Sequence, residues 1–142
     1  MILLDTNVVS EPLKVAADRN VVAWIDAQLI ETMYLSTISL AELRFGIAVL
    51  PEGKRKDVLH SNLEQRVIPL FSGRILPFDD AASRAYASLR ACARASGHAI
   101  APTDGYIAAI AAANGFAVAT RDKSPFEAAG LTVINPWDSR AH

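Results

Sequence analysis

The sequence is poor in the residues that build disulfides and zinc sites. Cys92 is the only cysteine among 142 residues, which excludes an internal disulfide and a cysteine-based zinc site. The histidines His60, His98 and His142 are too far apart in the chain to match a metal-ligand spacing. A single thiol also fits a reducing compartment, so we expect a cytoplasmic protein.

Long apolar runs and a strong net charge are also missing. The longest apolar run, Tyr106 to Ala113, is far below the roughly 20 residues that cross a bilayer, and we expect no membrane association. The short apolar run from Met1 is unlike a signal peptide, since it already ends at Asp5. A formal net charge of −1 gives no overall attraction to nucleic acid, so polynucleotide contacts would need local basic clusters or bound cations.

Short apolar runs alternate with helical patterns along the whole chain. The length, and a content of 51% hydrophobic and 20% charged residues, predict a single domain over residues 1–142. Strands are expected at 1–4, 33–36, 75–78, 116–120 and 131–134, with Pro77 favouring a sheet edge for the third. Helices are expected at about 21–29, 39–50, 53–67, 81–96 and 102–113, and a further one begins near Pro125. This order predicts an α/β fold, a three-layer α/β/α sandwich with a five-stranded parallel sheet.

Four acidic residues follow the ends of these expected strands or begin helices. Asp5 directly follows the first strand, Glu42 lies near the start of the helix after the second, and Asp122 follows the fourth. These three converge by topology, because the carboxyl ends of parallel strands share one edge of the sheet. Asp104 begins a helix that leads into a strand, so the strand-like segment 99–101 would have to bring it to that edge.

Converging carboxylates need compensating charge. Two unit charges about 4 Å apart repel by roughly 4 kcal/mol at an effective dielectric constant of 20. Oxygen ligands without histidine or cysteine favour Mg²⁺ or Mn²⁺. Such a site can activate water and stabilise a displacement at phosphorus, so the predicted chemistry is metal-assisted phosphodiester hydrolysis.

Each acid taken singly also has a structural interpretation. Ser39 and Glu42 have the spacing of a capping box, Asp104 could stabilise a helix N-terminus, and Asp122 fits an ordinary turn. Asp5 is harder to explain in this way, because an acid directly after a buried strand needs a partner or a metal.

Four segments together resemble a known family. They are Leu3–Asn7, Ser39–Gly46, Thr103–Ala109 and Ala119–Asp122, and in this order and spacing they closely resemble the PIN-domain family. The segments Ser10–Pro12 and Val133–Trp137 are similar to its VapC/FitB-type toxin branch. The resemblance runs from Met1 to about Trp137.

The resemblance implies a five-stranded parallel sheet between helices and a negatively charged pocket that binds Mg²⁺ or Mn²⁺. It also implies a ribonuclease that serves as the toxin of a type II toxin–antitoxin pair. The metal-site acids of the family map onto the four acids described above. The neighbours Thr6, Asn7 and Thr120 fall where polar side chains support that pocket.

The resemblance also implies partners. Family members usually form homodimers, cleave RNA, and are held inactive by a VapB/FitA-like antitoxin whose C-terminal segment lies over the active-site groove. Promoter DNA is bound only through the antitoxin. An alternative stays open, in which the nuclease site is silent and the protein acts mainly as a co-repressor subunit with a DNA-binding antitoxin.

Two positions depart from the family pattern. Gly105 follows Asp104 where many members carry alanine, which weakens the helix start without removing the carboxylate. Ser124-Pro125-Phe126 stands where many relatives have an acid before the phenylalanine, so Asp122 would supply the fourth carboxylate alone.

Overall fold

Five parallel strands form one sheet in the computed structural model, which describes residues 1–138. The strand order is β3-β2-β1-β4-β5, and each neighbouring pair is parallel. The strands are β1 (Ile2–Leu4), β2 (Met33–Ser36), β3 (Ile75–Leu76), β4 (Ala117–Ala119) and β5 (Val133–Ile134). The short β3 lies at an edge, as the sequence predicted, but it stops before Pro77 and does not reach residue 78, because proline cannot donate to a neighbouring strand.

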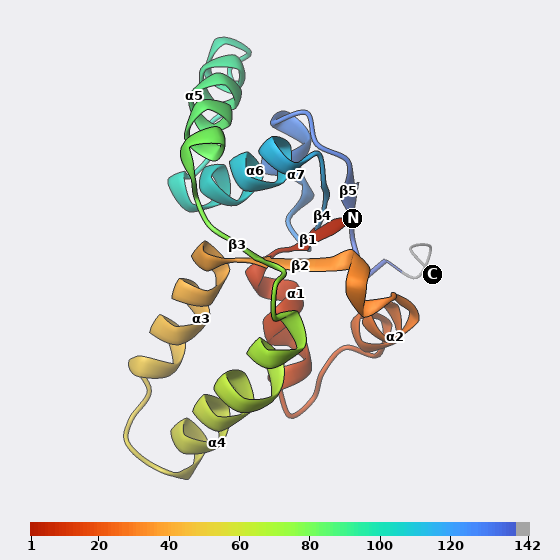
Figure 1. The fold of residues 1–142 in the computed structure, drawn as a ribbon, viewed down its shortest axis with the longest axis vertical. Coiled ribbons are helices and arrows are strands. Elements are labelled where there is room, and N and C mark those ends of the chain that lie inside the picture. The colour runs from red at the N-terminus through yellow and green to blue at the C-terminus, as the bar shows by residue number, and fades with distance from the viewer. Residues whose placement is uncertain (139–142) are drawn as a thin grey trace.

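Helices cover both faces of this sheet. The α-helices of the described residues are α1 (Thr6–Ser10), α2 (Arg19–Ala27), α3 (Thr37–Ala48), α4 (Lys54–Asn62), α5 (Asp80–Ala95), α6 (Pro102–Asn114) and α7 (Lys123–Ala128). The shorter elements are η1 (Glu11–Leu13), η2 (Ile30–Thr32), the π-helical η3 (Leu63–Val67) and η4 (Ile68–Phe71). In Figure 1, α5, α6 and α7 lie on one side of the sheet, and α1 to α4 lie on the other. No helix within 1–138 is long and apolar enough to cross a bilayer.

The core is divided by the sheet into two apolar clusters. Leu3 and Val118 pack with α5, α6 and α7, whereas their neighbours Leu4 and Ala119 pack with the helices of the opposite face. All four side chains are almost fully buried. Burial on both faces explains why these central strands show no polar alternation, and it confirms the predicted α/β/α sandwich.

The largest differences from expectation are at element boundaries. The short helix α1, which directly follows Asp5, is not among the expected helices. The helix expected over 53–67 is α-helical only to Asn62 and continues as η3 and η4, the latter containing Pro69. The segment 99–101, expected to be strand-like, is not a strand. The helix expected to begin near Pro125 is α7, which begins two residues earlier at Lys123.

Candidate active site

Asp5 lies at the junction of the central strand β1 and helix α1. Its backbone N–H donates to the carbonyl of Ala119 at 2.9 Å, which extends the β1–β4 pairing by one residue. As N-cap of α1, its Oδ1 accepts from the Thr6 N–H at 2.8 Å, and its Oδ2 accepts from the Thr120 hydroxyl at 2.8 Å. The carboxylate is 6% exposed and is therefore held in one orientation.

Burial raises the pKa of Asp5 to about 6. Desolvation is the main cause, because it disfavours the charged form. The hydrogen bonds from Thr120 and Thr6 lower the pKa, while the charges of Asp104 and Glu42 raise it further. The carboxyl group is thus close to the protonated state at mildly acidic pH.

Glu42 reaches the same place from α3 through a chain of hydroxyl groups. The Thr6 hydroxyl lies 2.5 Å from Glu42 Oε1 and 3.0 Å from the Ser39 hydroxyl. Ser39 in turn is bonded to Ser36, whose hydroxyl accepts the Ser39 backbone N–H at 3.0 Å and caps α3. The alternative interpretation of Ser39 and Glu42 as a capping box is not what the structure shows: Ser36 is the cap, and the Glu42 carboxylate bonds to Thr6.

Asp104 lies in the first turn of α6 and is partly buried. Burial raises its pKa, and the negative charges of Asp122 and Glu42 raise it further. Since segment 99–101 is not a strand, the packing of α6 against the sheet and α5 brings Asp104 to this edge. Alanine at 101 offers no side-chain cap, so Asp104 is the acid that complements this helix N-terminus.

Asp122 follows β4 as the N-cap of α7, and its carboxylate makes no capping bond. Its backbone N–H donates to the Thr120 hydroxyl at 3.1 Å. The Asn7 side-chain N–H₂ also approaches that hydroxyl at 3.5 Å, while Asn7 Oδ1 accepts the Arg121 N–H at 3.4 Å. Thr120 is fully buried, and the hydrogen bond that its hydroxyl donates to Asp5 links the end of β4 to that carboxylate.

The four acids form one electrostatic group with Asp104 at its centre. Asp104 is coupled to Asp5, Glu42 and Asp122, and Asp5 is also coupled to Glu42. Within residues 1–138, none of these carboxylates forms an ion pair with a basic side chain. In the same range, no three His, Cys, Asp or Glu side chains are already arranged to hold a metal ion. No basic side chain within residues 1–138 therefore compensates this negative charge through an ion pair.

The polar neighbours Thr6, Asn7 and Thr120 were predicted from the sequence, whereas two buried serines, Ser36 and Ser39, were not. Ser36 and Ser39 are both fully buried and connect the end of β2 to the Thr6–Glu42 pair. A local signal was present, because Ser36 and Ser39 have the i, i+3 spacing of a side-chain cap and the N–H that it accepts. The contact between Ser39 and Thr6, 33 residues apart, had no such signal.

A family model described as "PIN domain" matches residues 2–131. The chain belongs to the PIN-domain family. This PIN domain is 62% identical to the protein named VapC ribonuclease Y4jK of Sinorhizobium fredii over 138 residues, which is 97% of this chain and 99% of the relative. It is 54% identical to the toxin FitB of Neisseria gonorrhoeae over 137 residues, which is 96% of this chain and 99% of FitB.

Solved structures agree with this assignment. The crystal structure named FitAcB from Neisseria gonorrhoeae matches the PIN domain with a TM-score of 0.94 and 54% identity. The match covers 96% of this chain and 99% of the other. A structure of FitAB bound to the IR36 DNA fragment also has a TM-score of 0.94, at 52% identity, and covers 97% of this chain and 96% of the other. The resemblance drawn from the four sequence segments is confirmed.

Proposed function

We propose that this protein is the ribonuclease toxin of a type II toxin–antitoxin pair and that it hydrolyses RNA phosphodiester bonds with the help of Mg²⁺ or Mn²⁺. The observation that carries the proposal is the group of four carboxylates, in which Asp104 interacts with each of the other three and none has a basic partner among the described residues. The names of the relatives, VapC ribonuclease and toxin FitB, favour the same function.

The donor set fits a hard divalent cation. Asp5, Glu42, Asp104 and Asp122 offer only oxygen ligands, which Mg²⁺ and Mn²⁺ prefer. Asp104 and Asp122 accept no hydrogen bond from the described residues, and one oxygen of Glu42 is equally free. Exposed Glu42 and Asp122 can rotate toward Asp5, which its two hydrogen bonds hold in place.

The metal and the protein would contribute differently to the reaction. When bound, the metal supplies positive charge that can activate water and stabilise the charge developing on the phosphate. Thr6 orients Glu42, and Thr120 orients Asp5, because each hydroxyl bonds directly to one carboxylate oxygen. Such supporting bonds reduce the reorganisation that ligand binding would otherwise require.

The proposal includes partners. Relatives were solved as FitAB with DNA and as VapBC2 from Rickettsia felis with a promoter fragment. We therefore infer a VapB/FitA-like antitoxin that inhibits this protein and through which the complex contacts promoter DNA. A homodimer and a cytoplasmic location, where RNA and antitoxin are both present, complete the proposal.

The test is RNA cleavage by the purified full-length protein without antitoxin. Wild-type protein should cleave RNA only with Mg²⁺ or Mn²⁺, and Asp5→Asn should lower the rate at least about 100-fold while the circular dichroism spectrum stays native. Asp80→Asn is the matched control, because Asp80 is an exposed acid paired with Arg84 and is not part of the acidic group. It should cleave like wild type.

Two results would contradict the proposal. Equal cleavage by the wild type and Asp5→Asn would identify a contaminating nuclease. The second result is a folded wild-type protein that cleaves no RNA but still supports DNA binding by its antitoxin. It would favour the alternative, a silent co-repressor subunit.

A further inference from the structure

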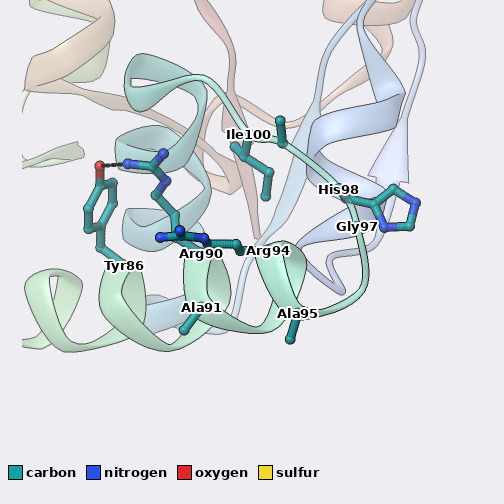
Figure 2. Close-up of a pocket in the computed structure, with 9 residues that line it drawn as sticks. Tyr86, Arg90, Ala91, Arg94, Ala95, Gly97, His98 and Ile100 are labelled. Atoms are coloured by element: carbon teal, nitrogen blue, oxygen red, sulfur yellow. Dashed lines mark hydrogen bonds between the residues drawn. The ribbon is translucent and has the colours of Figure 1, made fainter.

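A hollow of about 1040 Å³ lies beside the C-terminal half of α5, where the chain turns back toward α6 (Figure 2). Its lining contains the basic residues Arg90, Arg94 and His98 and no acidic residue. Figure 2 shows both arginine side chains rising from α5 into this region, whereas the His98 ring points away from them. The hollow therefore has a positively charged wall made by two arginines.

Arg90 is held in a defined orientation. Its Nη1 donates to the Tyr86 hydroxyl at 2.7 Å, and its guanidinium carbon lies 5.4 Å from the centre of the Tyr86 ring. The Tyr86 ring is itself stacked on Tyr106, with ring centres 4.8 Å apart. Because a guanidinium has five N–H donors, most of those on Arg90 stay available to a ligand.

Gly105 brings Arg90 close to the acidic group. A Cβ atom at Gly105 would lie 3.0 Å from Tyr86 Cε2 and 3.4 Å from Arg90 Cδ, so both side chains rest against the first turn of α6. Gly105 directly follows Asp104, and consecutive Cα atoms are about 3.8 Å apart. Arg90, which lines the hollow, therefore contacts the residue that follows one of the proposed catalytic acids.

The charge of the two arginines is uncompensated. Arg90 and Arg94 are four residues apart on α5, so they share one face, where like charges repel. Within residues 1–138 neither forms an ion pair. Arg94 lies in the last turn of α5, where the helix dipole stabilises a positive charge. Arg90 lies one turn earlier and is half-buried, so the dipole does not account for its charge. An anionic ligand such as a phosphate, which offers two oxygens to each guanidinium, would provide hydrogen-bond acceptors and opposite charge for both arginines.

We propose that Arg90 and Arg94 bind backbone phosphates of the RNA substrate next to the bond that is cut, and that the hollow aligns the strand on the acids. The inference rests on the proposed ribonuclease function. Arg90 is then a positioning residue whose orientation depends on Tyr86. Phosphate contacts carry no base information, so their effect is the same for RNAs of different sequence.

The test measures binding of single-stranded RNA to full-length Asp5→Asn protein, in which cleavage is suppressed, over a range of salt concentrations. Adding Arg90→Gln or Arg94→Gln should weaken binding and reduce the slope of log affinity against log salt by about 0.7 for each arginine removed. Arg84→Gln is the matched control, because Arg84 lies on α5, is paired with Asp80 at 3.0 Å and does not line the hollow. It should leave the slope close to its starting value.

A second readout uses proteins that keep Asp5. Arg90→Gln should raise KM for RNA several-fold and change kcat little, since the residue positions the substrate and does not touch the reacting atoms. Tyr86→Phe keeps the ring but removes the hydroxyl that holds Arg90, so it should shift KM in the same direction by a smaller factor. Thermal unfolding of each variant shows whether α5 stays folded.

The outcomes separate this inference from the proposed function. Equal salt slopes for Arg90→Gln, Arg94→Gln and Arg84→Gln, with cleavage intact, would overturn the phosphate site alone. Normal RNA binding with lost affinity for the antitoxin would assign the hollow to the protein partner and equally overturn it. If wild type does not cleave but the slopes still depend on both arginines, the ribonuclease function fails and the RNA site stands.

Discussion

Asp5 carries a carboxyl group whose charged form is disfavoured by its surroundings. It is almost completely buried, two other carboxylates raise its pKa, and only two hydrogen bonds favour its ionised state. A purely structural N-cap would not need the neighbouring acids. The residue is therefore better explained by a ligand that compensates the charge than by its capping bond to Thr6.

The raised pKa of Asp5 predicts how stability depends on pH. The folded protein binds this proton up to about pH 6, whereas the unfolded chain releases it near 3.8. The metal-free protein should therefore lose roughly 3 kcal/mol of stability as the pH rises from about 4 to above 6. Urea unfolding across this range should show the loss for wild type and a flatter profile for Asp5→Asn. Identical profiles would contradict the burial of a titrating Asp5.

Replacing glycine by alanine should have opposite effects on stability at Gly105 and at Gly46. Gly105→Ala places a methyl group 3.0 Å from Tyr86, whose ring is held by Tyr106 and Phe78, so overpacking should destabilise the protein by about 1 kcal/mol. Gly46→Ala, also inside a helix, meets nothing within 4 Å and should stabilise by up to about 1 kcal/mol. Thermal unfolding measures both. A stabilising Gly105→Ala would mean that the Tyr86 ring moves freely.

Among the helices, α3 is connected to the acidic group through its first turn. Its cap Ser36 and the following Ser39 are fully buried and lead to Thr6 and Glu42, so the beginning of this helix is bonded to the acidic group. The start of α5 has an equivalent cap in Asp79, which accepts the Ala82 N–H at 2.9 Å without such a connection. The two caps are alike in local geometry and differ in whether hydrogen bonds connect them to the acidic group.

This difference predicts separable effects of removing each cap. Ser36→Ala and Asp79→Ala should each cost about 1 kcal/mol of stability, because each leaves helix N–H groups unpaired. Only Ser36→Ala should also weaken Mg²⁺ or Mn²⁺ binding, about 10-fold, since Ser36 supports the hydroxyl chain to Glu42. Chemical denaturation and metal titration measure the two quantities. Equal metal affinity in both variants would show that the serines serve only the helix.

On the scale of the whole molecule, the acidic group joins segments from one end of the chain to the other. Asp5 lies between β1 and α1, Glu42 in α3, Asp104 in α6 and Asp122 between β4 and α7. A ligand that binds all of them links both sides of the sheet, and it can do so only in the folded state. Its binding free energy then adds to the stability of the entire domain.

Metal should accordingly stabilise the domain against heat. At about 100 times its Kd, Mg²⁺ or Mn²⁺ adds about 2.7 kcal/mol, which raises Tm by several degrees for a domain of this size. Asp104→Asn should lose most of this shift, because Asp104 is coupled to the three other acids. Asp80→Asn should retain it. A shift of equal size in both variants would place the ion elsewhere.

Local sequence patterns were enough to predict the order and type of the main elements and the strand ends that Asp5 and Asp122 follow. These follow from the spacing of apolar residues, from Pro77 and from helix-ending glycines such as Gly115, all of which act on neighbouring residues. The boundary errors arose where two local signals competed, as at Ser36 and Ser39.

How the acids meet depends on contacts between segments that are far apart in the chain. The position of Asp104 depends on the packing of α6, the bond from Thr6 to Glu42 joins residues 36 apart, and the pKa of Asp5 depends on burial by distant segments. The approach of Arg90 to Gly105 is likewise a contact between two helices. Such contacts depend on how whole elements pack, and local spacing along the chain does not record them.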